Sequence, residues 1–278
     1  TQRNFIRMSS DGILQNTEDF LAKLDREKKL NLFTFKWGDK YGPEYVNRLY
    51  GSLRKYISTP FNFTCITDDS TGILPEIGLL DYNQIGPDSW RVYPQNQIFT
   101  REKLTLFDLD IPGTKLWVDL DLLIHGDITE LVNRDFEKPT FILNHWNIKK
   151  EHAHKWFGKG SDCHVNSSFV AWQDAQWLFD YTDKNLEKLM FTYKSLDKYL
   201  FYQHWRTYRL NFWEEGIVDN YNFSVPAYEY REESKMTLFN TSHIRIQRMG
   251  IKAFELHETK GLLHGKNWPY KYWTSYDE

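Results

Sequence analysis

One stretch decides the fold of this 278-residue sequence: Leu116-Trp-Val-Asp-Leu-Asp-Leu-Leu-Ile124. It is an apolar run that carries two carboxylates two residues apart, and it follows the helix-breaking pair Pro112-Gly113. Residues two apart in a β-strand point to the same side, with Cα atoms roughly 6.5–7 Å apart. We therefore predict a strand over Lys115–Asp121 that places Asp119 and Asp121 on one face at its carboxyl end.

Strands and helices alternate on the amino-terminal side of this stretch. The apolar segments Leu30-Asn-Leu-Phe-Thr-Phe35 and Phe61-Asn-Phe-Thr-Cys-Ile66 are typical of buried strands. Between them we expect a helix over Pro43–Tyr56, because proline suits the first turn of a helix, and a further helix over about 100–109. This alternation predicts an α/β fold with a mostly parallel sheet flanked by helices. Ligands of such sheets bind beyond the carboxyl ends of the strands.

The two ends of the chain depart from this alternation. In the carboxyl-terminal half we expect strands near Thr140–Leu143 and Val165–Trp172, and helices near Ala175–Phe191 and Lys194–Tyr202. We expect residues 1–29 to form an N-terminal helical extension, in which Asn16 or Thr17 caps a short helix. Residues 30–278 are predicted to form a single domain.

Composition excludes several classes of function. The net charge is −3, so no basic field attracts nucleic acid, and we expect no nucleic-acid partner. The longest apolar stretches are a few residues, so we expect no transmembrane segment. Two cysteines, Cys65 and Cys163, are too few for a disulfide framework or a cysteine zinc cluster. These features together predict a reducing, cytoplasmic setting.

The paired carboxylates indicate where chemistry takes place. Two carboxylates at the end of an apolar strand are unfavourable unless a positive charge neutralises them. Hard divalent cations with oxygen ligands supply that charge, and they also bind diphosphates. An Asp-x-Asp in a surface turn is common, so it is the preceding hydrophobic run that favours a site at Asp119 and Asp121.

A second group of candidate ligand-binding residues lies near the carboxyl terminus, in Gly261-Leu-Leu-His-Gly-Lys-Asn-Trp-Pro-Tyr270. Here His264 suits a metal ion, Lys266 suits a phosphate, and Gly265 allows the backbone to approach a ligand closely. The alternative interpretation is an ordinary loop histidine beside an ordinary lysine. The paired aspartates are what favour the first interpretation.

Five groups of segments carry a resemblance to a known family. They are Phe35-Lys-Trp-Gly-Asp-Lys-Tyr-Gly-Pro-Glu-Tyr-Val-Asn-Arg-Leu-Tyr50, Cys65-Ile-Thr-Asp-Asp69, Leu116-Trp-Val-Asp-Leu-Asp121 with Gly126-Asp-Ile128, Val165-Asn-Ser-Ser168 and Leu263-His-Gly-Lys266. In this order they resemble glycosyltransferases of the GT-A fold with a DxD motif, a Rossmann-like α/β fold. The resemblance covers about residues 30–270 and is nearest to bacterial and viral relatives of the glycogenin and lipopolysaccharide-galactosyltransferase group.

The resemblance implies a metal-dependent transfer of sugar from a nucleotide-sugar donor, UDP-linked, to a glycan or other hydroxyl acceptor. The metal would be Mn²⁺ or Mg²⁺, with Asp121 as its principal ligand, Asp119 touching the metal or the donor ribose, and His264 as the third protein ligand. Residues 30–125 would form the nucleotide-binding half and 126–278 the acceptor-side half. A protein of this class would be cytoplasmic, either free or peripheral to a membrane where acceptor glycans are assembled.

The same resemblance implies roles for individual residues. The donor would be bound by Phe35, Lys36, Tyr41, Asp68, Asp69, Lys103, Asp119, Asn166, Ser167, Gly265 and Lys266. The catalytic groups would be Asp121, Lys266 and Asp197. Asp197 falls where many relatives carry Asp-Gln, but this chain has Lys198 in place of the Gln. Asp197 would be the base of an inverting enzyme, whereas a retaining enzyme needs no such base, and the sequence does not decide between the two.

Two rival functions stay open at this point. One is a catalytically inactive GT-A-like protein that binds carbohydrate through its aromatic residues, which make up 17% of the chain. The other is a sugar nucleotidyltransferase, which shares substrates and metal. That class would carry a glycine-rich phosphate loop soon after the first strand, and Phe35-Lys-Trp-Gly-Asp39 is a poor version of one.

Overall fold

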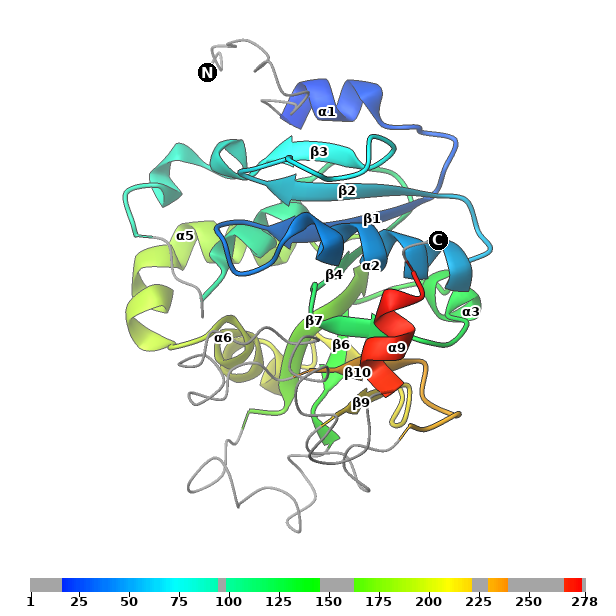
Figure 1. The fold of residues 1–278 in the computed structure, drawn as a ribbon. Helices are drawn as coiled ribbons and strands as arrows, with labels where there is room; N and C mark the ends of the chain where they lie inside the picture. The colour runs from blue at the N-terminus through cyan, green and yellow to red at the C-terminus, as the bar shows by residue number, and fades with distance from the viewer. Residues whose placement is uncertain (1–16, 95–98, 146–162, 222–229, 240–267, 277–278) are drawn as a thin grey trace.

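The computed structural model describes residues 17–94, 99–145, 163–221, 230–239 and 268–276 (Figure 1). Within them a seven-stranded sheet has the strand order β3-β2-β1-β4-β7-β6-β8, and a smaller sheet has the order β5-β10-β9. The strands are β1 (Leu30–Lys36), β2 (Phe61–Thr67), β3 (Gly78–Asp81), β4 (Thr114–Val118), β5 (Leu122–Ile124), β6 (Thr140–Leu143), β7 (Val165–Trp172), β8 (Asn211–Phe212), β9 (Val218–Asn220) and β10 (Met236–Leu238).

The helices connect and cover these strands. They are α1 (Thr17–Lys23), α2 (Pro43–Tyr56), α3 (Thr129–Val132), α5 (Gln176–Thr192), α6 (Leu196–Gln203) and α9 (Trp268–Thr274), with short 3-10 helices η1 (Tyr82–Gln84), η2 (Asp88–Trp90), η3 (Arg101–Asp108) and η4 (Trp205–Thr207). None of the helices in the described ranges is long and apolar enough to pass through a lipid bilayer.

The large sheet is mostly parallel. Strands β3, β2, β1 and β4 run in one direction, and β8 is parallel to β6. Strand β7 is antiparallel to both of its neighbours, β4 and β6. Because β7 reverses, its first residues lie at the same edge of the sheet as the carboxyl ends of β1 and β4. This edge is therefore where residues from both halves of the chain meet.

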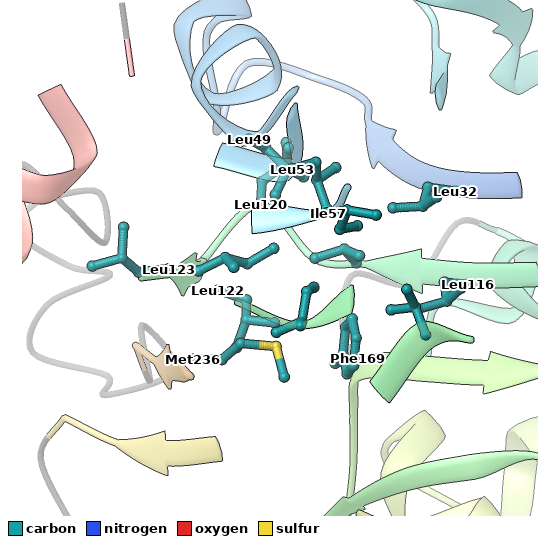
Figure 2. Packing of buried hydrophobic residues seen from close by; sticks show 14 of the residues in the cluster. Leu32, Leu49, Leu53, Ile57, Leu116, Leu120, Leu122, Leu123, Phe169 and Met236 are labelled. Atoms are coloured by element: carbon teal, nitrogen blue, oxygen red, sulfur yellow. The ribbon is translucent and has the colours of Figure 1, made fainter. Parts of the chain in front are cut away.

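Each face of the large sheet packs into its own hydrophobic core. In β1, Leu30 and Leu32 pack with α2, whereas Phe33 points to the opposite face and packs with η3 and α5. The alternation follows from the period of two in a strand. Figure 2 shows the first of these cores, where Leu49 and Leu53 of α2 lie in one cluster with side chains of β5 and β10.

The structure confirms most of the elements predicted from the sequence. A mostly parallel α/β sheet flanked by helices is present, α2 spans the predicted Pro43–Tyr56, and β6 and β7 have the predicted bounds. The short helix expected near Thr17 is α1. Its Phe20 is buried, and the ring centres of Phe20 and Phe33 lie 6.3 Å apart. The helix expected over about 100–109 is present as the 3-10 helix η3.

One prediction about a strand is wrong. The strand expected over Lys115–Asp121 ends at Val118, and a turn follows in which the Leu122 amide donates to the Asp119 carbonyl at 3.2 Å. Asp119 and Asp121 therefore lie in the connection between β4 and β5, which belong to different sheets. The two-residue spacing does not place the carboxylates side by side on one strand face.

Gly113 fixes the entry into β4. Its φ of +85° lies in the left-handed region, and a Cβ at this position would overlap the carbonyl oxygen of Lys29. That same oxygen accepts a hydrogen bond of 2.8 Å from the Thr114 amide, just ahead of the pairing between β1 and β4. The close approach of the two backbones requires glycine here.

Replacing Gly113 with alanine should lower the free energy of unfolding by about 2–4 kcal/mol, because it adds a backbone clash to an unfavourable φ. The matched control is Gly216→Ala, since Gly216 has a φ of +92° but nothing within 4 Å of an added Cβ. The control should cost about 1 kcal/mol, the conformational penalty alone. Urea unfolding of the two variants measures the difference, and equal losses would contradict the clash.

Candidate active site

The turn after β4 holds both aspartates at the carboxyl edge of the large sheet. The amide of Asp119 donates to the Ser168 carbonyl of β7 at 2.8 Å, and the carbonyl of Asp121 accepts from the Phe239 amide at 3.1 Å. The turn is thus bonded to both sheets at once. Because hydrogen bonds hold the backbone of both aspartates, the positions from which their side chains extend are fixed.

Asp119 forms an ion pair with Lys103. The Lys103 Nζ lies 2.5 Å from Asp119 Oδ1, and the two side chains are 11% and 22% exposed. Lys103 comes from η3, which packs on the sheet face opposite α2, and its ammonium group lies 5.8 Å from the centre of the Trp117 ring. The partial burial makes this pair stronger than an exposed salt bridge. The basic residue predicted before the DxD strand is therefore beside the first aspartate.

Asp121 faces a different set of groups. Its Oδ2 accepts a hydrogen bond of 3.4 Å from the Tyr41 hydroxyl. Burial, and after it the negative charge of Asp119, raise the pKa of Asp121 from 3.8 to about 6. The positive charges of Lys40 and Lys103 oppose that rise. The two aspartates are therefore close enough to repel each other, and the nearby lysines only partly offset the repulsion.

Asp197 reaches the same edge from α6. Its Oδ1 accepts two hydrogen bonds from Ser167, one from the amide at 3.0 Å and one from the hydroxyl at 2.7 Å. Burial raises the pKa of Asp197, the Ser167 hydrogen bond and the charge of Lys103 lower it, and Asp119 raises it. The side-chain oxygen of Asn166, beside Ser167, accepts a hydrogen bond of 2.9 Å from the Ser168 amide.

The ends of β1 and β2 form an adjoining group of predicted donor-binding residues. Lys36 is buried and donates to the Asp69 carbonyl at 3.2 Å, while Asp68 accepts from the Gly38 amide at 2.9 Å. Next to them, Phe35 makes an edge contact with the buried Tyr82, and Trp37 stacks on Tyr82 with ring centres 5.4 Å apart.

The structure therefore brings together many of the residues singled out in the sequence. Contacts or electrostatic effects link Tyr41, Lys103, Asp119, Asp121, Ser167 and Asp197. Lys40 was not predicted, although its charge acts on Asp121, because nothing distinguishes it from other loop lysines. His264, Gly265 and Lys266 lie outside the described residues. Within the described ranges, no three His, Cys, Asp or Glu side chains are grouped as a metal site.

Comparisons with known proteins identify the fold. The sequence matches no protein-family model and no curated protein. The structure is similar to the galactosyltransferase LgtC in complex with donor and acceptor sugar analogs, with a TM-score of 0.52 and 12% identity over 79% of this chain and 95% of that one. An active-site mutant of LgtC gives a TM-score of 0.52 at 12% identity, over 76% and 87% of the two chains.

A third similar structure is the bifunctional glycosyltransferase WbbM, with a TM-score of 0.51 and 10% identity. The match covers 83% of this chain but 47% of WbbM, so the chain corresponds to about half of that protein. The structural neighbours are thus glycosyltransferases. The chain has their fold, the Rossmann-like GT-A fold that the resemblance in the sequence predicted.

The raised pKa of Asp121 predicts a dependence of stability on pH in metal-free buffer. The folded state holds the Asp121 proton more tightly than the unfolded state does, so this contribution to stability is lost as the pH rises from about 4 to 6. Asp121→Asn removes the loss and should raise the free energy of unfolding at pH 7.5 by about 1–3 kcal/mol.

Urea unfolding at pH 3.5, below the window, and at pH 7.5, above it, measures this effect. The variant and the parent should have similar stability at the lower pH and differ at the higher one. Asp127→Asn is the control, because the pKa of the fully exposed Asp127 is lowered instead, by hydrogen bonds from Thr129. A variant no more stable than the parent at pH 7.5 would mean that Asp121 is not held in an unfavourable ionised state.

Proposed function

We propose that the protein is a metal-dependent glycosyltransferase that moves a sugar from a nucleotide-sugar donor, UDP-linked, to a hydroxyl of a glycan or other acceptor. One observation carries the proposal. Asp119 and Asp121 lie close together at the carboxyl edge of the sheet, insufficiently neutralised, in a fold shared with LgtC. In this type of sheet that edge is the usual ligand-binding position.

The residues present fit a divalent cation. Burial and the neighbouring charge of Asp119 raise the pKa of Asp121, so a cation beside the two carboxylates would be favourable, and carboxylate oxygens are the ligands that Mn²⁺ and Mg²⁺ prefer. We assign Asp119 and Asp121 as ligands, with His264 as the third. When bound, such a metal supplies Lewis-acid stabilisation of the diphosphate leaving group. The proposal places Lys266 on the same diphosphate.

The described side chains have separate tasks in this proposal. Lys103 orients Asp119 through the ion pair, and in the proposal it also contacts the donor. Ser167 hydrogen-bonds one oxygen of Asp197 and so fixes the orientation of this carboxylate. For an inverting reaction Asp197 would accept the proton of the acceptor hydroxyl, a role that its raised pKa suits. For a retaining reaction it would hold a sugar hydroxyl.

The finer parts of the proposal concern the donor and the setting. Phe35, Lys36, Tyr41, Asp68, Asp69, Asn166, Ser167 and Gly265 complete the proposed donor site. Residues 30–125 form the nucleotide-binding half and 126–278 the acceptor-side half, with 1–29 as an extension. We place the protein in the cytoplasm, free or peripheral to a membrane where acceptor glycans are assembled, with no nucleic-acid partner.

A panel of nucleoside diphosphates with and without Mn²⁺ tests the donor and the metal together. UDP with Mn²⁺ should raise the melting temperature by several degrees, because ligands that bind only the folded state stabilise it by mass action. UDP in chelator-treated buffer should give little shift. Hydrolysis of the UDP-sugar in the presence of Mn²⁺ then separates an enzyme from an inactive carbohydrate-binding protein, which would show none.

Asp121→Ala should abolish turnover while the variant keeps its cooperative unfolding, because the change removes a proposed metal ligand at the edge of the sheet. Loss of such an interaction lowers kcat by about 10²-fold or more. Donor hydrolysis and transfer assays measure this. If the variant keeps near-normal transfer in chelator-treated buffer, the assignment of the metal is wrong.

Lys103→Met should affect the binding of the nucleotide and the binding of the metal differently. Binding of Mn²⁺ alone should be unchanged or tighter, because a positive charge leaves the surroundings of the aspartates. Binding of UDP in the presence of Mn²⁺ should weaken by about tenfold, because one charge-assisted contact is lost. Lys188→Met on the exposed face of α5 is the control and should change neither affinity. Calorimetric titrations measure both, and equal UDP affinity would remove Lys103 from the donor site.

A further inference from the structure

The last described helix packs directly on the helix that begins near the candidate active site. Figure 1 shows α9 beside α2, and the contact is centred on Trp273, which is buried. The Trp273 ring lies 4.6 Å from the ring of Tyr45, and the guanidinium of Arg48 lies 4.0 Å from the centre of the same ring. Two successive turns of α2 thus hold one side chain of α9.

The carboxyl-terminal segment also approaches α2 closely at Gly51, three residues after Arg48. Gly51 lies inside α2, where glycine is unfavourable. A Cβ on Gly51 would come within 2.6 Å of the Tyr276 carbonyl oxygen, so a larger residue would push the segment after α9 away. Tyr276 is buried, and its hydroxyl donates to the Ile124 carbonyl of β5 at 2.7 Å. Glycine is therefore explained by the close approach of the carboxyl-terminal segment.

The contact continues from α9 to the aspartates. Tyr45 is fully buried, and its ring also lies 4.7 Å from that of Tyr41. The Tyr41 hydroxyl donates to Asp121. A second route runs through Tyr276 to β5, the strand that begins directly after Asp121. Both routes end at the same turn.

We propose that α9 is a positioning element of the candidate active site: Trp273 fixes Tyr45, Tyr45 fixes Tyr41, and Tyr41 orients the carboxylate of Asp121. This inference rests on the proposed function for what Asp121 binds. The Tyr41–Asp121 distance of 3.4 Å is at the long end for a hydrogen bond, so a small displacement of Tyr41 breaks it. Partners that orient a metal ligand govern affinity for the metal even though they do not touch it.

Gly51→Ala tests the proposal without altering any side chain in the series of contacts that links Trp273 to Asp121. If α9 has no influence on the site, this change should leave binding intact and favour the helix, since alanine is the better helix former. If α9 positions Asp121, the displaced segment should weaken Mn²⁺ binding to the metal-free protein by about 5–10-fold. Electron paramagnetic resonance titration with Mn²⁺ measures the affinity directly, apart from turnover.

A double-mutant cycle identifies the route. Tyr41→Phe removes only the hydroxyl and should weaken Mn²⁺ binding to a similar extent as Gly51→Ala. The double variant should then bind no more weakly than Tyr41→Phe alone, because both changes remove the same interaction. Additive losses would overturn the route through Tyr41.

Tryptophan variants provide a second test should Gly51→Ala fold poorly. Trp273→Ala should weaken Mn²⁺ binding and Trp273→Phe should restore most of it, because phenylalanine keeps a ring against Tyr45. The matched control is Trp177→Ala, since Trp177 of α5 also packs beside an arginine, with the Arg209 guanidinium 5.1 Å from its ring centre. Trp177→Ala should leave Mn²⁺ affinity unchanged.

Hydrogen exchange separates failure of this inference from failure of the proposed function. Amides of 119–124 in the metal-free protein should exchange faster in Gly51→Ala than in Gly78→Ala, a control in β3 whose Cβ would meet Thr64 at 3.1 Å. If the parent protein binds no Mn²⁺, the proposed function fails, and faster exchange still supports the positioning by α9. Unchanged exchange, or unchanged Mn²⁺ affinity where the parent binds Mn²⁺, overturns it.

Discussion

Two negative charges held close together at the end of a hydrophobic strand are the constraint on which the rest of this structure depends. Burial of Asp121 and the negative charge of Asp119 beside it raise the pKa of Asp121 to about 6. Each carboxylate is contacted from a different part of the fold: Lys103 of η3 contacts Asp119, and Tyr41, in the loop before α2, contacts Asp121. Side chains from both faces of the sheet thus meet at one candidate site.

The sequence predicts a large part of this arrangement for identifiable reasons. The apolar strands and the helix after Pro43 follow from local periodicity, and parallel strands collect their carboxyl ends at one edge. That rule brings Asp119, Lys36 and Asp68 to the same edge of the sheet, although they are far apart in the chain. Ser167 and Asp197 were predicted only through the resemblance to glycosyltransferases, since nothing local in α6 indicates that it turns a carboxylate toward β7.

Other features depend on contacts that local patterns do not encode. The pattern Val118-Asp-Leu-Asp-Leu122 suits a continuous strand as well as a turn, and the turn forms because β5 pairs with β10 in a second sheet. The packing of Trp273 on Tyr45, and the glycine at position 51 that permits it, join residues from opposite ends of the sequence. Such pairs are set by tertiary packing, for which a single sequence offers no signal.

The reversed direction of β7 also limits how the molecule opens. Four residue pairs join β7 to β4, which lies in the amino-terminal half, and β7 continues into pairing with β6 on its other side. A rotation of one half of the chain against the other would have to break this ladder of backbone hydrogen bonds. The pairing of β4 with β7 therefore joins the two halves of the chain through backbone hydrogen bonds.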